Sequence, residues 1–526
     1  MLVCVYAGLL LLVVSLPYWL AWAKTSGDQV FSGFLFGVDD GNSYVAKMRL
    51  GVQGHWKFYI FYTAEEHDGV WLVYIAYIAV GQLVGLFVSD TDPALPGILI
   101  GVYHLMRWIF GALLIGVLYR FIAVYAADTR IRFTALVLAT IGGGFGWVLM
   151  LMGADSPPPE FFIPEDFTLQ ILLSLPHLAL ARAALLGGFL ALFASLNRQR
   201  WLLYALVAAL CWIILGLVVP FYLVSIYCIL GGWGLIAWIR QRRFPYDLFI
   251  RAVVGAGITL PLFIYNVVIF SVNPIFAQWA AQNLLYSPPP LHYVLAYLPL
   301  ALLAVIGGRA MWREADIRWP LLIGWPLLVP VLVYLPISVQ RRLAEAVIVP
   351  LAILAAMGIA RLAQRWSFRR VLIVTLLVTL PTSLLLLLGG FFTALSGSAQ
   401  IVYPAEQITA FNWLNQQAEP DSVVLSTFPT GTRLPVYTNL RVYIGHGPET
   451  LNYQAKTHIA EQFFADELTA AERSLLYTDN RIQYIFFGPA ERQFAPDEPA
   501  WLADAERIYA EGAYEIFRLP DSVESE

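Results

Sequence analysis

Long apolar runs, separated by short polar connections, fill most of the chain as far as about residue 393. A helix of about 20 apolar residues crosses the hydrocarbon layer of a bilayer, so each run of this length predicts a membrane-spanning helix. The pattern predicts eleven spans, at 1–22, 97–119, 132–152, 169–195, 201–219, 220–239, 248–270, 291–308, 319–338, 343–360 and 371–393. The first span lacks a charged leader and a small-residue cleavage site, so we expect it to remain as an anchor.

The connections between the spans alternate between arginine-rich segments and acidic or proline-rich ones. The arginines are Arg120, Arg130, Arg132, Arg198, Arg200, Arg240, Arg242, Arg243, Arg251, Arg309, Arg313, Arg318, Arg361, Arg365, Arg369 and Arg370. Because arginine-rich loops face the cytoplasm, we expect the N-terminus inside, and 23–96, 153–168, 271–290 and the chain beyond about residue 395 outside. A further apolar run at 70–88 would break this alternation if it crossed the membrane. We expect it to re-enter the membrane or to lie at the interface.

Polar residues become frequent after about residue 396, where short strand-like segments alternate with helical patterns. Strands are expected at 422–426, 441–445 and 483–487, and helices at 405–417, 452–465 and 468–477. The predicted fold is mainly α: a polytopic helical bundle with a C-terminal α/β domain. Its parts are a first transmembrane helix (1–22), a first extracytoplasmic loop with juxtamembrane helices (23–96), a transmembrane bundle (97–395) and an extracytoplasmic α/β domain (396–526).

Composition agrees with a membrane protein and excludes several functions. The chain is 59% hydrophobic and 13% charged, whereas soluble domains contain about 25% charged residues. A net charge of −4 does not suit a nucleic-acid partner. All three cysteines (Cys4, Cys211 and Cys228) lie in apolar stretches, which excludes a disulfide framework in the polar parts and indicates no thiolate metal site.

The first outer segment carries an acidic pair, Asp39 and Asp40. Two adjacent carboxylates at a membrane face repel each other, and desolvation raises the pKa of at least one. Such a carboxylate can accept a proton from a hydroxyl near neutral pH or coordinate a hard cation. The alternative is a solvated loop in which Asp39 or Asp40 caps the helix that begins near Tyr44. The same segment contains further candidates for substrate binding, which are Tyr44, Tyr62, Glu66 and His67.

Arg341 and Arg342 form a basic pair on the predicted outer face of the bundle, where the charge rule does not expect one. Guanidinium groups make charge-assisted contacts to phosphate oxygens, so this pair is a candidate for holding a lipid phosphate. The alternative is that both side chains extend to any anionic headgroup at the interface.

Ionisable residues also occur inside predicted spans. Arg107 lies one turn from His104, and Arg182 follows His177. Charged groups within a membrane are costly and usually have a functional or a pairing role. Arg107 and His177 are therefore candidates for substrate binding, and a purely structural ion pair is the alternative.

Two other features, the glycines at 142–146 and His446, are expected to have structural roles. The glycines at 142–146 lack the Lys-Ser/Thr of a phosphate loop, and we expect them to allow close helix packing. His446 could be a ligand or an acid/base, but it has no companion at metal-site spacing. We expect it to be a turn residue of the α/β domain.

The stretch DDGNSYVAKMRLG, from Asp39 to Gly51, combines an acidic pair, a tyrosine and a short amphipathic helix that ends near a glycine. Together with the layout of the spans, it is similar to the first-loop signature of the GT-C superfamily of membrane glycosyltransferases. This superfamily includes protein O-mannosyltransferases, aminoarabinose transferases and oligosaccharyltransferases. The run after Glu66 and His67 is similar to the juxtamembrane helices of the same family.

The resemblance implies an inverting transfer of a sugar from a polyprenyl-phosphate donor to a glycan, lipid or protein acceptor, on the outer face of the plasma membrane. Either Asp39 or Asp40 would take the proton of the acceptor hydroxyl, and Arg341 and Arg342 would hold the departing lipid phosphate. The chain has Asp-Asp where many members have Asp-Glu or Glu-Asp, and three residues, not two, separate the pair from Tyr44. These departures leave open which aspartate is the base and whether a divalent metal is bound.

Two other functions remain as alternatives. A transporter or flippase for a lipid-linked or anionic solute would account for Arg107 and Arg182, but not for the acidic loop and the outer domain. A non-catalytic protein would use the bundle as an anchor and the α/β domain as a binding module, yet eleven spans exceed what an anchor needs.

Overall fold

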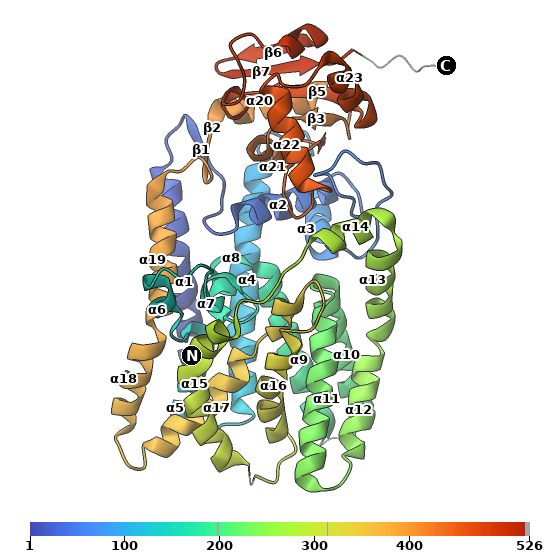
Figure 1. The fold of residues 1–526 in the computed structure, drawn as a ribbon. Helices are drawn as coiled ribbons and strands as arrows, with labels where there is room; N and C mark the ends of the chain where they lie inside the picture. Colours follow the sequence, from blue (N-terminus) through green and yellow to red (C-terminus); the bar gives the residue numbers. More distant parts are fainter. Residues whose placement is uncertain (197–198, 313, 521–526) are drawn as a thin grey trace. The chain divides into compact units, whose positions relative to one another are not determined.

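The computed structural model describes residues 1–196, 199–312 and 314–520, and most of them form helices (Figure 1). Arg198 and Arg313, two of the arginines used to orient the predicted spans, lie outside the described residues. The chain forms two compact units. The helical unit comprises Met1–Pro17, His104–Val268 and Leu284–Phe392, and the α/β unit comprises Tyr18–Tyr103, Ile269–Asn283 and Thr393–Glu526.

The helical unit is built from apolar helices, four of which (α1, α4, α13 and α19) continue into the α/β unit. The helices are α1 (Leu2–Lys24), α4 (Leu95–Ala123), α5 (Thr129–Ile141), α6 (Gly146–Leu151), α7 (Pro159–Phe162), α8 (Thr168–Ser174), α9 (Pro176–Leu196), α10 (Trp201–Val218), α11 (Tyr222–Gln241), α12 (Tyr246–Gly257), α13 (Leu260–Val272), α15 (Pro290–Met311), α16 (Trp319–Leu332), η1 (Gln340–Ala344), α17 (Ile348–Leu362), α18 (Phe368–Thr379) and α19 (Pro381–Ser396). Figure 1 shows α10, α11 and α12 running side by side in green.

The described residues contain eight helices that are long and apolar enough to cross a membrane, or up to ten if each bent pair, α12 with α13 and α18 with α19, is one span. These ten coincide with ten of the eleven predicted spans. The remaining one, 319–338, corresponds to α16, an apolar helix of 14 residues. The chain is therefore a multi-pass membrane protein, and the count of eleven stays a prediction.

Small residues allow the helices of this unit to approach closely. A Cβ atom on Gly307 of α15 would lie 2.0 Å from the carbonyl oxygen of Leu354 in α17, so only glycine fits there. In the glycine segment between α5 and α6, a Cβ atom on Gly144 would lie 2.0 Å from the carbonyl oxygen of Ala296 in α15. Gly144 thus serves close packing, as predicted for the glycines at 142–146, but it does so from a non-helical connection and not between two helices.

The α/β unit contains both the first polar segment and the C-terminal segment of the chain. Its elements are β1 (Gln29–Phe31), α2 (Val38–Val52), α3 (Ile75–Gly85), α14 (Pro274–Gln282), β2 (Val402–Pro404), α20 (Ala405–Gln417), β3 (Val423–Leu425), α21 (Phe428–Tyr437), β4 (Arg441–Val442), α22 (Tyr453–Phe464), α23 (Ala470–Asp479), β5 (Ile482–Phe487), α24 (Pro489–Arg492), η2 (Ala500–Asp504), β6 (Glu506–Glu511) and β7 (Tyr514–Arg518). The three predicted strands and three predicted helices of this part are present, whereas α21 and the β6–β7 hairpin were not predicted.

The apolar run at 70–88 forms α3, which has 11 residues. At about 1.5 Å per residue this helix is roughly half as long as the hydrocarbon layer is thick. Its length agrees with the expectation that the run does not cross the membrane.

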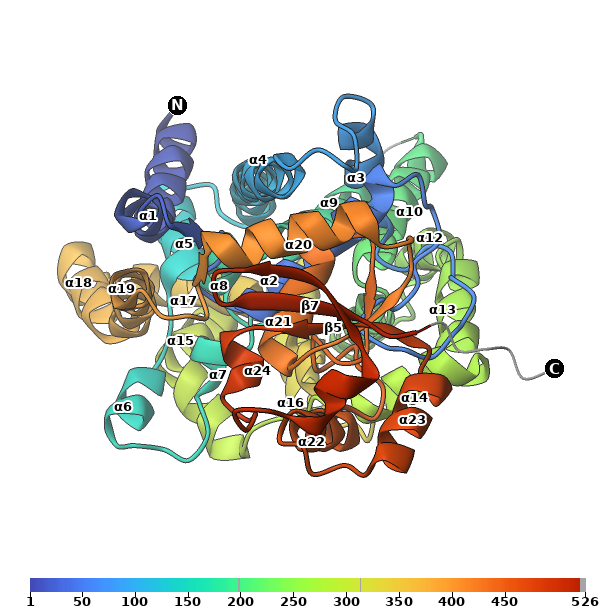
Figure 2. The same ribbon diagram turned by 90° about the horizontal axis from the view of Figure 1, so that it is seen from above.

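A five-stranded mixed sheet forms the centre of the C-terminal part, in the order β4-β3-β5-β7-β6. Strands β4, β3 and β5 are parallel, and β7 runs antiparallel to β5 and β6. Successive side chains of β5 face opposite sides of the sheet. Phe486 contacts Phe411 of α20 at 4.9 Å between ring centroids, and Phe487 contacts Phe464 of α22 at 6.2 Å. Helices therefore cover both faces, as the view from above shows (Figure 2).

Residues from the first polar segment are built into the same unit. Strand β1 pairs with β2 in antiparallel fashion, although about 370 residues separate them. The backbone N–H of Val442 in β4 donates a hydrogen bond to the carbonyl oxygen of Phe61 at 3.0 Å. These backbone contacts hold the N-terminal end of α2 close to the loops that follow the parallel strands.

Candidate functional site

The acidic pair lies in the first turn of α2. The helix begins at Val38, directly after Gly37, whose left-handed backbone (φ 54°, ψ 52°) turns the chain into the helix. Gly37 occupies the N-cap position, and no side chain caps the helix. The hypothesis that Asp39 or Asp40 is the capping residue is therefore wrong. Both carboxylates lie near the positive end of the helix dipole, which favours their negative charge.

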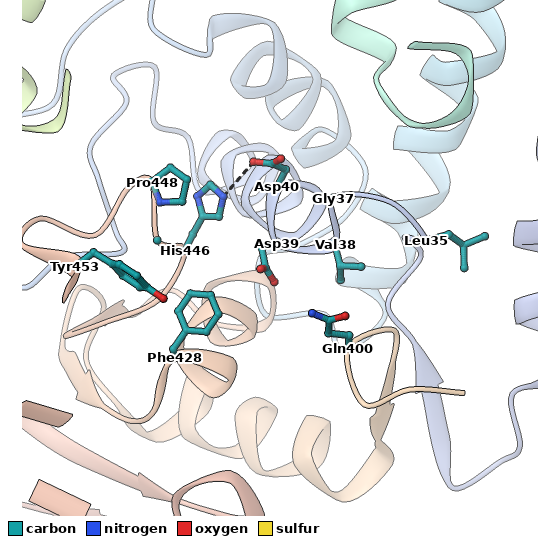
Figure 3. Close-up of a pocket in the computed structure, with 11 residues that line it drawn as sticks. Leu35, Gly37, Val38, Asp39, Asp40, Gln400, Phe428, His446, Pro448 and Tyr453 are labelled. Atoms are coloured by element: carbon teal, nitrogen blue, oxygen red, sulfur yellow. Dashed lines mark hydrogen bonds and ion pairs between the residues drawn. The ribbon is translucent and has the colours of Figure 1, made fainter. Parts of the chain in front are cut away.

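A pocket of about 570 Å³ opens in front of the acidic pair (Figure 3). It is lined by Leu35, Gly37, Val38, Asp39, Asp40, Gln400, Phe428, His446, Gly447, Pro448 and Tyr453, all from the α/β unit. In Figure 3 the carboxylate of Asp39 points between Phe428 and Gln400. The aromatic rings of Phe428 and Tyr453 contact each other edge to face, with 5.6 Å between their centroids. The pocket thus combines carboxylates with a partly exposed aromatic wall.

His446 brings the C-terminal segment to the acidic pair. It lies in the turn after β4, and its Nε2 atom is 3.1 Å from Oδ1 of Asp40, 406 positions away in the sequence. Its Nδ1 atom is 3.2 Å from Oε1 of Glu449. The sequence correctly predicts that His446 lies in a turn, but it does not predict the contact with Asp40. No local signal could have shown it, because the companion residue belongs to the other end of the chain.

A buried ion pair contacts this histidine through Glu449. Nζ of Lys47 lies 2.7 Å from Oε1 of Glu449, and the side chains of these two residues are 0% and 2% exposed. The hydroxyl of Ser43 also donates to Oε1 of Glu449, at 2.7 Å. Lys47, which was not among the candidates from the sequence, lies about two turns further along α2 than Asp40, the last residue of this helix in the pocket lining. Asp40, His446, Glu449 and Lys47 form one continuous chain of charged groups, which we call the charged chain.

The surroundings shift the pKa values of these groups in different directions. Burial raises the pKa of Asp39, opposed by the positive charges of His446 and Arg433 and assisted by Asp40. Burial alone would lower the pKa of His446, but its hydrogen bonds to Asp40 and Glu449 raise it to about 9. Burial would likewise raise the pKa of Glu449, but Lys47 and His446 lower it to about 2. At neutral pH, His446 is therefore an imidazolium and Glu449 a carboxylate.

The raised pKa of His446 predicts how stability depends on pH. A histidine whose folded-state pKa of about 9 exceeds the ordinary value of 6.5 stabilises the fold fully below the lower value, and this contribution is lost as the pH rises through the upper one. We expect the thermal unfolding temperature of the purified protein to fall between about pH 7 and about pH 10. His446→Gln should flatten this part of the profile. An unchanged slope in His446→Gln would show that other groups cause the decrease.

Of the other candidates in the first segment, Tyr62 lies beside the charged chain and Tyr44 supports the helix. The ring of Tyr62 is 5.7 Å from that of His446, and its hydroxyl donates to the carbonyl oxygen of Thr432 at 3.3 Å. Tyr44 stacks on Tyr77 of α3 with 4.8 Å between centroids. Neither residue belongs to the pocket lining.

Glu66 and His67 have structural contacts. Glu66 forms an ion pair with Arg481, and both side chains are largely exposed. Nε2 of His67 accepts a hydrogen bond from the backbone N–H of Ile60 at 2.9 Å, and Nδ1 lies 2.8 Å from the carbonyl oxygen of Glu65. Burial lowers the pKa of His67, which fits these roles of one accepting and one donating nitrogen. The loop is thus held in shape by two residues that the sequence suggested for substrate binding.

In the helical unit, Arg341 and Arg342 lie in η1, before α17. Arg342 is ion-paired with Glu165, with 3.4 Å from Nε to Oε1. The guanidinium of Arg341 lies 5.0 Å from the centre of the Phe162 ring, and that of Arg342 lies 5.3 Å from the Phe221 ring. The guanidinium groups of both arginines therefore lie over aromatic rings.

Arg107 and Arg182, the arginines within the spans that the sequence singled out, form contacts with other residues of the bundle. Arg107 donates to the carbonyl oxygen of Leu173 at 2.7 Å and to the hydroxyl of Ser15 at 2.8 Å. Arg182 is paired with Glu345, also at 2.7 Å, and both side chains are 0% exposed. His177, in the first turn of α9, is partly buried. For Arg107 and Arg182 these contacts favour the structural alternative.

No group of three or more His, Cys, Asp or Glu side chains in the described part of the chain is arranged to hold a metal ion. Asp40 and His446, two potential ligands in the pocket, are bonded to each other. The divalent cation that the sequence left open thus has no preformed cluster of ligands in these residues.

No protein-family model matches this chain, and no curated protein sequence matches it. Solved structures do match in fold. This chain is similar in fold to the Archaeoglobus fulgidus oligosaccharyltransferase tethered to an acceptor peptide with the NVT sequon. The match covers 91% of this chain and 69% of that enzyme, with a TM-score of 0.54 at 12% identity. The apo form of that enzyme matches 99% of this chain and 74% of its own, with a TM-score of 0.51 at 13% identity.

A weaker likeness, with a TM-score of 0.47 at 15% identity, links this chain to ArnT from Cupriavidus metallidurans bound to undecaprenyl phosphate, over 98% of both chains. The match to the oligosaccharyltransferase extends over nearly the whole chain, so it includes the first polar segment and the C-terminal segment as well as the bundle. The protein therefore has the fold of the GT-C glycosyltransferases, the superfamily that its sequence resembles.

Proposed function

We propose that this protein is an inverting glycosyltransferase, which moves a sugar from a polyprenyl-phosphate donor to an acceptor hydroxyl on the outer face of the plasma membrane. The observation that carries the proposal is the pocket in front of α2. There Asp39, whose pKa burial raises, faces an aromatic wall in a chain with the GT-C fold.

The chemistry requires a base and a binding group for the leaving phosphate. The acceptor oxygen attacks C1 of the sugar while its proton passes to an aspartate of the pair, and the bond from C1 to the phosphate oxygen breaks with its electrons going to the phosphate. A single displacement of this kind inverts the configuration at C1. Arg341 and Arg342 are suited to bind the phosphate, since guanidinium donors stabilise the negative charge that grows on it.

The pocket lining supports a sugar as the ligand. Small-molecule sites typically combine aromatic walls with a few polar groups that fix orientation. Phe428 and Tyr453 provide an aromatic wall of this kind, and Gln400, Asp39 and Asp40 provide polar groups. The volume of about 570 Å³ lies within the usual range for such sites.

The structural neighbour and the charged residues of the bundle bear on the alternatives. The Archaeoglobus enzyme is an oligosaccharyltransferase whose structure holds a tethered acceptor peptide, and for this chain we keep a glycan, a lipid and a protein as acceptors. The transporter alternative depended on Arg107 and Arg182. Both of these side chains are bonded within the bundle, which weakens that alternative.

A donor panel tests the proposal. The purified protein in proteoliposomes is incubated with a membrane extract that supplies glycan, lipid and protein acceptors, and with polyprenyl-phosphate sugars that carry a radioactive label. Nucleotide sugars of the same hexoses and pentoses are the matched controls. We expect the label to leave at least one polyprenyl-phosphate donor, with release of one polyprenyl phosphate per sugar, and to remain on the nucleotide sugars. Movement of an intact donor across the bilayer without any cleavage would instead support the flippase.

A further inference from the structure

Four charged side chains connect the pocket to the interior of the α/β unit, and the proposed reaction does not yet use three of them. We infer that His446, Glu449 and Lys47 hold Asp40 in a fixed position as a compensated carboxylate, and that Asp39 is thereby the residue that receives the proton. His446 acts through Asp40, so it is a positioning residue. The inference rests on the proposed function for the role of Asp39, whereas the coupling of the charged chain can be tested independently.

The orientation of His446 is determined from both sides. Its Nε2 atom faces Asp40 at 3.1 Å and its Nδ1 atom faces Glu449 at 3.2 Å. An imidazolium donates through both nitrogens, so rotation of the ring would break two charge-assisted hydrogen bonds at once. The ring of Tyr62 lies 5.7 Å from the imidazole ring and limits its movement further.

Glu449 is held in turn by three groups at one oxygen. Oε1 of Glu449 lies 2.7 Å from Nζ of Lys47, 2.7 Å from the hydroxyl of Ser43 and 3.2 Å from Nδ1 of His446. The ammonium group of Lys47 is surrounded by aromatic rings, of which that of Tyr74 is nearest, with 4.1 Å to its centroid. The position of His446 is therefore set by α2 itself, the helix that also carries the acidic pair.

The burial of the Lys47–Glu449 ion pair is costly in free energy, so stability alone does not account for this pair. Removing two charged groups from water is costly, and replacing a buried ion pair with apolar side chains of similar volume is often neutral or stabilising. Lys47 and Glu449 are nonetheless 0% and 1% exposed. Ionisable groups with perturbed pKa values that lie at a pocket are candidates for a functional site.

The balance of charge separates the two aspartates. Along the charged chain the signs alternate from Asp40 to Lys47, so its four charges cancel. Asp39 lies outside this chain, and within the described residues it forms no ion pair, although the charges of His446, Asp40 and Arg433 act on it at longer range. The guanidinium of Arg433 itself is engaged with Gln407 and the carbonyl oxygen of Ala399. Asp39 is thus the carboxylate of the pair whose oxygens can take up the acceptor's proton.

A double-mutant cycle between Asp40 and His446 tests the inference. For the donor identified in the panel, His446→Gln and Asp40→Asn should each lower kcat about tenfold with little change in KM, an effect within the range measured for residues of one hydrogen-bonded network. The double variant should be no slower than either single variant. His458→Gln, which alters an exposed histidine of α22, is the matched control and should leave kcat unchanged. The inference would be overturned if the effects of the two substitutions on kcat multiply in the double variant, or if His446→Gln keeps the wild-type kcat.

Thermal unfolding gives the same cycle without catalysis. The double variant of Asp40→Asn and His446→Gln should have the same unfolding temperature as either single variant, because the two residues act together. A second double variant, Lys47→Met with Glu449→Gln, should remain folded, because it removes both charges of the buried ion pair and leaves neither unpaired. If no donor is cleaved, the proposed function fails, and this second cycle still decides whether the charged chain is coupled. Additive effects on unfolding would overturn the coupling even if transfer is observed.

Discussion

Replacing Asp39 with Asn is expected to lower the kcat for sugar transfer by about 10²-fold or more, as for other positioned bases. The amide keeps the shape of the side chain but cannot accept the proton of the acceptor hydroxyl. Since Asp39 forms no ion pair within the described residues, the change should leave donor binding nearly intact. Single-turnover transfer and equilibrium binding of the donor separate the two effects.

Two comparisons make this result specific. Asp68→Asn changes an exposed aspartate of the same polar segment and should transfer sugar at the wild-type rate. Asp40→Asn should be less severe than Asp39→Asn, because Asp40 is committed to His446. If Asp40→Asn proves the slower enzyme, the two aspartates exchange roles and the inference from the charged chain is wrong.

Replacing Arg341 and Arg342 together with Ala is expected to lower kcat/KM for the donor by about 10²-fold, as when donors to a developing negative charge are removed. Replacement of both with Lys should recover only part of this loss, because an ammonium group lacks the planar pair of donors that suits phosphate. Equilibrium binding of polyprenyl phosphate to protein in bilayers of neutral lipid measures the effect directly.

The neutral bilayer distinguishes phosphate binding from attraction to anionic headgroups. If Arg341 and Arg342 only extend to the interface, their replacement should matter in anionic lipid and not in neutral lipid. Arg365→Ala, in the exposed connection after α17, is the matched control and should bind polyprenyl phosphate normally. If Arg365→Ala loses as much polyprenyl-phosphate binding as the Arg341 and Arg342 variant, the effect is due to the overall charge of the protein.

Local patterns in the sequence were sufficient for much of the fold. Ten of the predicted spans coincide with the helices or bent pairs that the structure identifies as long and apolar enough, because transfer from water to hydrocarbon depends on the residues of one segment alone. The strands at 422–426 and 483–487 were predicted for a similar reason, since each is a short apolar run between polar ones. The β6–β7 hairpin was missed because its strands, ERIYAE and YEIFR, carry many charged residues.

The candidate site depended on contacts that no local pattern contains. The acidic pair could be selected from its own sequence, but His446 and Glu449 could not, because their partners Asp40 and Lys47 lie more than 400 positions away. Likewise, the sequence could not decide whether Arg182 serves a substrate or a partner, and the structure pairs it with Glu345 across 163 positions.

By itself, therefore, the sequence determined the membrane-spanning character of the chain, the α/β nature of its C-terminal part and the identity of the acidic pair, since hydrophobicity and local charge decide these. Only the tertiary structure decided which groups face that pair, because it brings the first polar segment and the C-terminal segment together. This contact depends on packing and backbone hydrogen bonds throughout the α/β unit. The pocket between Asp39 and the Phe428–Tyr453 wall is a product of that contact.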